Sequence, residues 1–261
     1  MPEGVELYPC RVNEQAADWI VPKTYSSSAV LLYLHGGGFV FETLRVHEVL
    51  VGRIALAAGV KALIPNYRVA PEYPFPAAVD DVLQAYRFLL KEGYTSEQII
   101  LGGDSAGGGL VFSTLIALRD AGEPQPAAAF TLSPWVDLEA SGESMKAMAE
   151  ADPCLDQASL LQMAAIYLDG ADSKAPLASP LYADLSGLPP LYIQVGTAEI
   201  LLDDSRRIAE RARLAGVQVK LECFEDLIHV FQGLAPTVPE ATFAIERLAR
   251  FVQEHLAPPS N

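Results

Sequence analysis

The hydrophobic positions of this chain alternate between short continuous runs and longer stretches with a helical period. Continuous apolar runs of roughly four to eight residues are typical of strands buried on both faces of a sheet. Short runs that are wholly or mainly apolar cover residues 30–34, 62–64, 98–102, 127–132 and 191–195. Helical patterns lie between or after them, at residues 46–58, 77–90, 105–118, 203–214 and 240–255. This alternation predicts an α/β fold, in which parallel β-α-β units have helices on both faces of the sheet.

Three stretches complete or interrupt this pattern. Residues 5–12 and 17–21 predict two short strands before the first buried run, and residues 217–224 predict a last strand. Between about residues 139 and 182 the alternation stops, and a helix-rich stretch without a strand follows. We therefore expect one domain over residues 1–261, with residues 139–182 as a helical insertion over the sheet.

A glycine-rich serine turn stands at the centre of the predicted sheet. Gly-Asp-Ser-Ala-Gly at residues 103–107 follows one apolar run and precedes a helical pattern. Strand, tight turn and helix form the context in which this pattern presents a nucleophilic serine. Glycines two residues before and after Ser105 let the chain turn sharply and expose the hydroxyl near a helix N-terminus. A plain glycine-rich loop is the alternative interpretation, so partner residues must decide.

Four histidines could act as the base that a serine nucleophile needs. His47 lies in a helical surface pattern, and His255 lies in the final turn of the last helix. His35 opens a glycine run and is expected to brace that loop. His229 follows the last predicted strand by five residues. A loop histidine at the carboxyl end of that strand could reach Ser105 across the end of the sheet. His229 is therefore the candidate base.

The base needs a carboxylate that fixes its tautomer and stabilises the imidazolium. Glu199 lies in the loop four residues past the 191–195 strand, whereas Asp203 and Asp204 stand at the start of the next helix. At a helix start, an N-cap or a favourable interaction with the dipole is the ordinary role of an aspartate. Glu199 is favoured as the acid and Asp203 is kept as the alternative. Either choice gives the chain order serine, acid, histidine.

An oxyanion formed by attack on a carbonyl needs backbone donors already in place. Gly37 and Gly38 follow the 30–34 strand, and the absence of a Cβ lets a substrate approach their N–H groups closely. Ala106, directly after the serine, supplies a third N–H. These three residues are the candidate oxyanion hole. The glycines lack the Gly-Lys-Ser/Thr ending of a phosphate-binding loop.

Composition narrows the classes of partner. The net charge of −15 argues against nucleic acid and against anionic membranes as partners. Three widely spaced cysteines show no metal-binding spacing and predict no disulfide framework, and Cys10 and Cys223 are expected to be small core residues. The N-terminus lacks a signal-peptide pattern and no apolar run is long enough to cross a membrane. We expect a soluble cytoplasmic protein.

Five motifs of the chain point to one family. They are His-Gly-Gly-Gly-Phe at 35–39, Tyr-Arg-Val-Ala-Pro-Glu at 67–72 with Phe-Pro-Ala at 75–77, Gly-Asp-Ser-Ala-Gly-Gly at 103–108, Ser-Pro-Trp-Val-Asp-Leu at 133–138, and His-Val-Phe at 229–231. On these motifs the chain resembles the bacterial hormone-sensitive-lipase-like (family IV) carboxylesterases of the α/β-hydrolase superfamily. The resemblance implies an α/β-hydrolase fold, with a mostly parallel central sheet flanked by helices and a helical cap. It places the nucleophile on Ser105, the base on His229, and the oxyanion donors on Gly37, Gly38 and Ala106.

The chain departs from the family pattern at two places. The family commonly has aspartate at the acid position of an Asp-x-Leu-x-Asp pattern, where this chain has Glu199 followed by Asp203. Family members also usually carry a few dozen N-terminal residues of the cap before the first strand, which is expected here at Val5. The N-terminal cap segment is thus expected to be short or missing, which leaves residues 139–182 as the cap.

These residues lead to a hypothesis for the function. A serine carboxylesterase would cleave esters of short to medium acyl chains through an acyl-enzyme, without a metal or organic cofactor. A non-catalytic small-molecule binding protein on the same fold and a dehydratase or lyase that uses the same oxyanion loop are the alternatives. The expected partner is a small-molecule ester. The last strand, as an edge strand, is a candidate contact for a homodimer.

Overall fold

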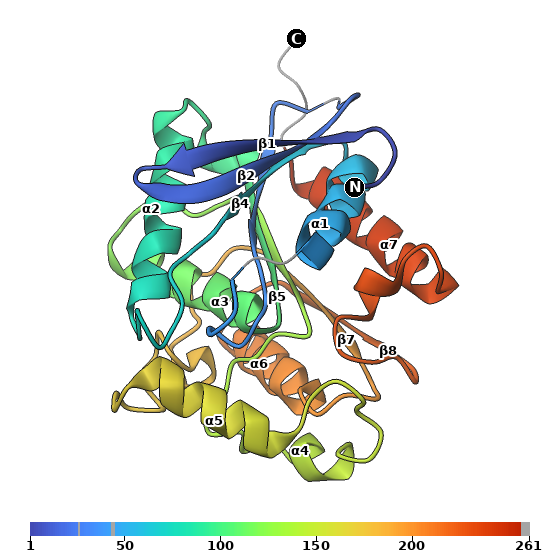
Figure 1. Ribbon diagram of the computed structural model, residues 1–261. Coiled ribbons are helices and arrows are strands. Elements are labelled where there is room, and N and C mark those ends of the chain that lie inside the picture. The colour runs from blue at the N-terminus through green and yellow to red at the C-terminus, as the bar shows by residue number, and fades with distance from the viewer. Residues whose placement is uncertain (26, 43–44, 257–261) are drawn as a thin grey trace.

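The computed structural model describes residues 1–25, 27–42 and 45–256, and its strands form one sheet (Figure 1). The strand order across this eight-stranded sheet is β1-β2-β4-β3-β5-β6-β7-β8. β2 pairs antiparallel with β1 and with β4, and all other neighbours pair parallel. The predicted mostly parallel α/β sheet is confirmed. The strands are β1 (Val5–Val12), β2 (Gln15–Pro22), β3 (Val30–Leu34), β4 (Lys61–Pro65), β5 (Ile99–Asp104), β6 (Ala128–Leu132), β7 (Leu191–Gly196) and β8 (Val219–Phe224).

Helices cover both faces of the sheet. α1 and α7 pack on one face, and α2, α3 and α6 on the other (Figure 1). The α-helices are α1 (Arg45–Ala58), α2 (Ala77–Lys91), α3 (Ser105–Asp120), α4 (Ser144–Ala147), α5 (Gln157–Leu168), α6 (Leu202–Leu214) and α7 (Pro239–His255). Three short 3₁₀ helices are η1 (Ser96–Gln98), η2 (Pro180–Tyr182) and η3 (Phe231–Leu234).

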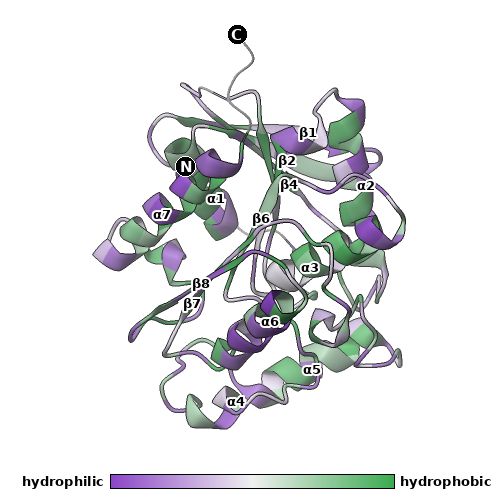
Figure 2. Cartoon of the chain, turned by 180° about the vertical axis from the view of Figure 1, so that it is seen from behind, coloured by the Kyte–Doolittle hydropathy of each residue, from purple (hydrophilic) through white to green (hydrophobic). Residues whose placement is uncertain are grey.

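The apolar runs of the sequence divide between two cores. In β3, Leu31 and Tyr33 join the core under α1 and α7, while Leu32 and Leu34 join the core under α2, α3 and α6. Successive side chains of a strand point to opposite faces, so a strand covered on both faces needs apolar residues at every position. α3 is buried nearly all round and shows mainly hydrophobic colour, whereas α6 shows much hydrophilic surface (Figure 2).

The stretch that interrupts the alternation carries α4, α5 and η2. Its described residues contain no strand. α4 and α5 lie beyond one end of the sheet, next to α3 and α6 (Figure 1). Met163 of α5 reaches the turn that follows β3, because its Sδ lies where a Cβ on Gly38 would be. Residues far apart in sequence therefore meet at this end of the sheet.

The expected role of two cysteines is only partly met. Cys223 is exposed on β8, so its assignment to the core is wrong, and Cys10 on β1 is half-buried. Both strands are edges of the sheet, and β8 has no fully buried position. An apolar run at an edge therefore does not guarantee burial. None of the helices in the described part of the chain has the length and apolar character needed to cross a bilayer.

The serine turn is pressed against the end of β3. Ser105 has a φ of +52°, a conformation that costs energy for any residue with a side chain. A Cβ on Gly103 would lie 2.5 Å from the Gly107 carbonyl oxygen, and a Cβ on Gly107 would overlap the carbonyl oxygen of Leu34. Both obstacles are backbone atoms, which cannot rotate away. Glycine on both sides of Ser105 is what allows β5 to turn directly into α3.

Gly107→Ala is therefore expected to destabilise the fold, because the new methyl group collides with the backbone of β3. A loss of about 3 kcal/mol in the free energy of unfolding is expected. Urea titration followed by circular dichroism measures it. Gly233→Ala is the matched control, since a Cβ there meets no atom within 4 Å. Equal stability of the two variants would contradict this account of the turn.

Candidate active site

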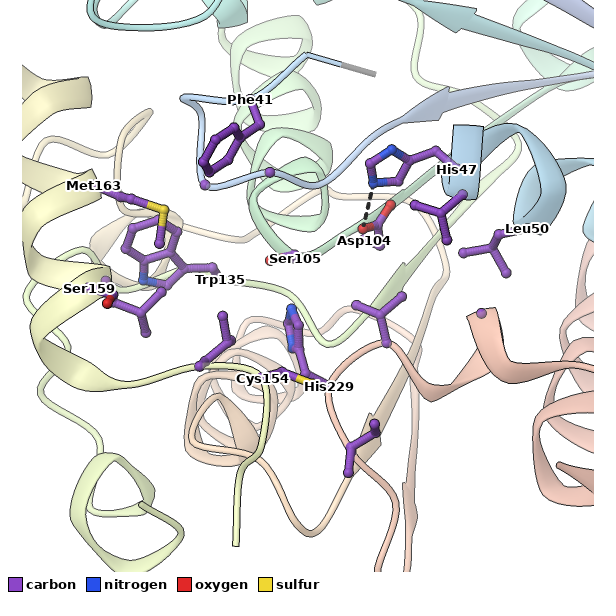
Figure 3. Close-up of a pocket in the computed structure, with 18 of the residues that line it drawn as sticks. Phe41, His47, Leu50, Asp104, Ser105, Trp135, Cys154, Ser159, Met163 and His229 are labelled. Carbon is purple, nitrogen blue, oxygen red and sulfur yellow. Dashed lines mark ion pairs between the residues drawn. The ribbon is translucent and has the colours of Figure 1, made fainter. Parts of the chain in front are cut away.

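The candidate site lies at the end of the sheet where the parallel strands β3, β5, β7 and β8 finish. A pocket of about 570 Å³ opens there, and Ser105, His229, Gly37 and Gly38 are among the residues that line it (Figure 3). In the close-up, the imidazole of His229 points toward Ser105. Four of the residues singled out in the sequence are thus gathered at one cavity. Ala106, the next residue along from Ser105, is fully buried at the start of α3.

His229 is held by the carboxylate of Glu199. Its Nδ1 lies 2.7 Å from Glu199 Oε2, so the ring donates Nδ1–H to the carboxylate. An imidazole held in this way keeps Nε2 as the nitrogen that can accept a proton. Glu199 is completely buried and lies behind His229 rather than in the pocket lining.

The second oxygen of Glu199 is also saturated. Glu199 Oε1 accepts hydrogen bonds from the Ser133 hydroxyl and from the Gly196 N–H, both at 2.7 Å. The Ser133 Oγ in turn accepts the N–H of Val230 at 3.2 Å. Ser133 follows β6, so three neighbouring strand ends meet at this carboxylate. Ser133 was part of a matched motif, but its sequence alone indicated no such role.

Glu199 also changes the protonation of His229. Burial disfavours the charged imidazolium, but the hydrogen bond and the charge of Glu199 outweigh it. The negative charges of Asp104 and Asp152 act in the same direction. Together they raise the pKa of His229 above its ordinary value of about 6.5.

The turn after β3 carries the other two candidate residues. Gly37 has a φ of +122° and Gly38 a φ of +61°, conformations that side chains rarely adopt. A Cβ on Gly37 would lie 2.8 Å from the carbonyl oxygen of Phe41. The Gly37 carbonyl accepts the N–H groups of Val40 and Phe41 at 3.1 and 3.0 Å, which closes the turn. Both glycines are needed to keep this turn beside Ser105.

His35 stands at the base of this turn, as expected. It is fully buried, its ring stacks on Tyr67 at 4.1 Å, and its Nδ1–H donates to the Gly36 carbonyl at 2.6 Å. Burial lowers the pKa of His35 to about 3, and the charge of His47 adds to this effect. His35 is therefore a neutral brace of the turn.

The structure corrects the expectation for His47. The helical pattern placed this residue on the surface, but only 8% of it is exposed and it lines the pocket. Its Nε2 lies 3.8 Å from Oδ2 of Asp104. The sequence pattern missed it because α1 begins beside the pocket, a tertiary contact that local periodicity does not report. Asp104 was likewise not singled out.

Asp203 and Asp204 lie in the first turn of α6, at the helix start as expected. The N-cap position is taken by Leu201, so neither aspartate is the N-cap. Asp203 accepts the N–H of Ser144 at 2.8 Å, which ties α6 to α4. His229 contacts Glu199. Asp203 lines a separate surface hollow with Arg206 and Arg207.

No group of three or more His, Cys, Asp or Glu side chains in the described residues could hold a metal ion. The pocket lining is mainly apolar. Its apolar side chains are Phe41, Val46, Leu50, Trp135, Leu155, Leu160, Met163, Ile228, Val230 and Leu234.

Comparison with known proteins assigns this arrangement to a family. The family model described as "alpha/beta hydrolase fold" matches residues 31–233. The chain belongs to this family. The match includes the triple-glycine turn, the serine turn and both His229 and Glu199.

Curated relatives of this hydrolase carry the names esterase and acetyl-hydrolase. An acetyl-hydrolase of Streptomyces hygroscopicus is 44% identical over 93% of this chain and 81% of its own length. An esterase of Acinetobacter venetianus is 34% identical over 95% of the chain and 82% of its own length. The relatives identify this chain as a carboxylic ester hydrolase.

Solved structures agree with this assignment. An esterase from the bacterial hormone-sensitive lipase family superposes with a TM-score of 0.96 at 49% identity, over 98% of this chain and 87% of its own. The esterase EstE5, soaked with p-nitrophenyl butyrate, superposes with a TM-score of 0.94 at 44% identity, over 97% and 85% of the two chains. The α/β-hydrolase fold and the resemblance to the hormone-sensitive-lipase-like esterases are confirmed.

A second buried carboxylate supports the segment that runs past the hydrolase pocket. Asp204 Oδ2 accepts the N–H groups of Val136 and Asp137 at 2.9 and 3.0 Å, directly after Trp135 of the pocket wall. Burial raises the pKa of Asp204 to about 8, and the charge of Asp137 adds to it, while these two N–H groups and Arg207 oppose it. Asp204 is therefore mainly protonated at pH 7.

This protonation gives a pH-dependent contribution to stability. The pKa of Asp204 is raised from 3.8 to about 8, so the folded state binds the proton more tightly than the unfolded chain. Its contribution to stability is present at low pH and is lost as the pH rises from about 4 toward 8.

Asp204→Asn is expected to be close to wild type in stability at pH 5 and more stable than wild type at pH 9. Asparagine keeps the acceptor oxygen but never has to carry a buried charge. Urea titrations of both proteins at the two pH values measure the difference. Asp203→Asn is the control, and its difference from wild type is expected not to grow in the same way. If the free energy of unfolding of wild type instead rose relative to that of Asp204→Asn between pH 5 and pH 9, the raised pKa of Asp204 would be contradicted.

Proposed function

We propose that this hydrolase is a serine carboxylesterase that cleaves esters of short to medium acyl chains. Ser105 is the nucleophile, His229 the base, Glu199 the acid, and Gly37, Gly38 and Ala106 the oxyanion donors. The observation that carries the proposal is the 2.7 Å contact between His229 Nδ1 and Glu199 Oε2 beside the serine turn. It supports Glu199 over Asp203 as the acid.

The first half-reaction acylates the enzyme. Nε2 of His229 takes the proton of the Ser105 hydroxyl as Oγ attacks the ester carbonyl carbon, and the imidazolium is stabilised by Glu199. The carbonyl oxygen becomes an oxyanion near the N–H groups of Gly37, Gly38 and Ala106. The C–O bond to the alcohol then breaks, and His229 returns the proton to the leaving alkoxide.

The second half-reaction releases the acid. His229 takes a proton from water, the hydroxide adds to the acyl carbon, and the bond to Ser105 Oγ breaks as His229 returns the proton to it. Water and ester are consumed, and an alcohol and a carboxylic acid are formed. Every proton passes through His229, so no cofactor takes part in the proposed cycle.

The pocket supports the proposed substrate range. Its apolar lining favours uncharged hydrocarbon groups, and its volume of about 570 Å³ lies in the range of small-molecule sites. Met163 packs beside Gly38 and limits the space next to the turn. Short and medium acyl chains fit such a space.

Ser105→Ala is expected to lower turnover of p-nitrophenyl butyrate by about 10⁴-fold or more, because the attacking atom is gone. Ser186→Ala is the control, since the hydroxyl of that exposed serine donates to the surface residue Asp184. Wild type should also bind one equivalent of an organophosphonate probe at Ser105. Substantial turnover by Ser105→Ala would refute the nucleophile, and a protein that neither turns over nor takes the probe would favour a binding function.

The acid assignment predicts two effects of Glu199→Gln. The variant loses the charge that stabilises the imidazolium, so kcat is expected to fall by about 10²- to 10⁴-fold. The pKa of His229 also falls, so the acid limb of the kcat/KM profile moves to lower pH. In wild type that limb should lie above pH 6.5, because the pKa of His229 is raised and the base must be neutral.

Asp203→Asn is the matched comparison for this test. Its carboxylate contacts Ser144 and is expected to leave the position of the acid limb unchanged. A larger loss of kcat in Asp203→Asn than in Glu199→Gln would overturn the choice of Glu199. Activity of wild type that stays constant down to about pH 4 would count against His229 as the base.

A further inference from the structure

Asp104, the residue before Ser105, does not do what its position suggests. It stands at the N-cap of α3, where an aspartate commonly accepts a backbone N–H of the helix. Its side chain makes no such bond. Instead Oδ1 accepts the Tyr33 hydroxyl at 2.9 Å, and Oδ2 lies 3.8 Å from Nε2 of His47 (Figure 3). The carboxylate therefore faces α1 rather than the helix that it begins.

The same carboxylate lies directly against the triple-glycine turn. A Cβ on Gly36 would overlap Asp104 Oδ2, so only glycine lets the turn pack this closely. Tyr33 belongs to β3, which leads into the turn, and His47 belongs to α1, which follows it. One buried carboxylate thus touches the strand, the turn and the helix around the proposed oxyanion donors.

His47 is placed to pair with this carboxylate. A carboxylate removed from water is costly unless a hydrogen bond or an opposite charge compensates it. The 3.8 Å separation from His47 Nε2 exceeds an ordinary hydrogen bond, but it is within the range of an ion pair with an imidazolium. His47 is itself held in place beside His35, with ring centroids 5.5 Å apart.

The charged surroundings of this pair come from several elements. η3 packs against α1 without a titratable side chain, and the buried residues of α7 are all apolar. β2 places Asp18 opposite Ile64, on the face of the sheet that α1 covers. In the described residues, the other titratable groups near the pair or on α1 are Tyr33, His35, Arg45, Glu48, Arg53, Tyr67, Asp152, Glu199 and His229.

We propose that His47 is a positioning residue of the esterase. As the ion-pair partner of Asp104, it holds that carboxylate under the triple-glycine turn and offsets its negative charge at His229. This inference rests on the proposed function, since it requires Ser105 and His229 to carry out the reaction.

The proposal fixes the sign of a pH effect. The charge of Asp104 favours the protonated form of His229. Without His47 that charge is uncompensated, so His229 should hold its proton to higher pH and activity should fail earlier on acidification. Removal of the Asp104 charge should have the opposite effect. A contact with a purely structural role would leave the acid limb of the pH profile unchanged in both variants.

The test is a double-mutant cycle of His47→Gln and Asp104→Asn on p-nitrophenyl butyrate, with active sites counted by the organophosphonate probe. Alone, His47→Gln is expected to lower kcat about tenfold, to change KM by less than about twofold, and to move the acid limb to higher pH by up to about one unit. In the Asp104→Asn background, its effect on kcat should be less than about twofold.

His255→Gln is the matched control, because that imidazole bonds the Phe251 carbonyl on α7 outside the pocket. The proposal is overturned if His47→Gln has the same effect in both backgrounds, leaves the acid limb in place, or lowers only the melting temperature. Loss of turnover in Ser105→Ala together with a His47→Gln variant that matches wild type would refute this inference alone. Retained turnover in Ser105→Ala would refute the proposed function instead.

Discussion

The arrangement of the site depends on one buried carboxylate, that of Glu199. A buried charge is costly unless hydrogen bonds compensate it. The hydrogen-bond partners of the Glu199 carboxylate lie at or after the ends of neighbouring strands. β6 leads to Ser133, β7 ends at Gly196, and β8 leads to the loop with His229. Because these three strands are adjacent and parallel, their carboxyl ends lie side by side at one end of the sheet. The topology therefore delivers the donors, and the carboxylate in turn fixes the imidazole.

A second constraint is the close approach of the serine turn to β3. Gly107 packs against the carbonyl of Leu34, and Gly36 packs against the carboxylate of Asp104. The two turns are thus in contact through positions that admit no Cβ. This contact sets the separation between Ser105 and the triple-glycine turn, a distance on which the proposed oxyanion hole depends. Gly37, Gly38 and Ser105, in these two turns, all have positive φ.

The strands and the residues gathered at their carboxyl ends could be predicted from the sequence, because both depend on local patterns. Apolar runs gave the strands, and the residues after β3, β5, β7 and β8 had to share one edge. The side chain of His47 was misplaced because α1 begins beside the pocket, a contact with Asp104 that lies 57 positions further on and that no local period encodes. The contacts of Asp204 could not be predicted for the same reason, since its partners Val136 and Asp137 belong to a loop distant in sequence. The predicted burial of Cys223 was wrong because the apolar run of an edge strand resembles that of a central strand in sequence.

Glu199 is one methylene longer than the aspartate of the family pattern, and its side chain folds back to accommodate this length. Glu199 folds back toward its own strand, so that Oε1 accepts the N–H of Gly196, three residues earlier. This leaves Oε2 directed at His229. The Ser133 hydroxyl holds the same Oε1 and also receives the N–H of Val230, next to His229. Glu199, Ser133 and the loop segment of His229 and Val230 are therefore linked by a closed set of hydrogen bonds. Such a set restricts the imidazole to one orientation, which is what proton transfer at Nε2 requires.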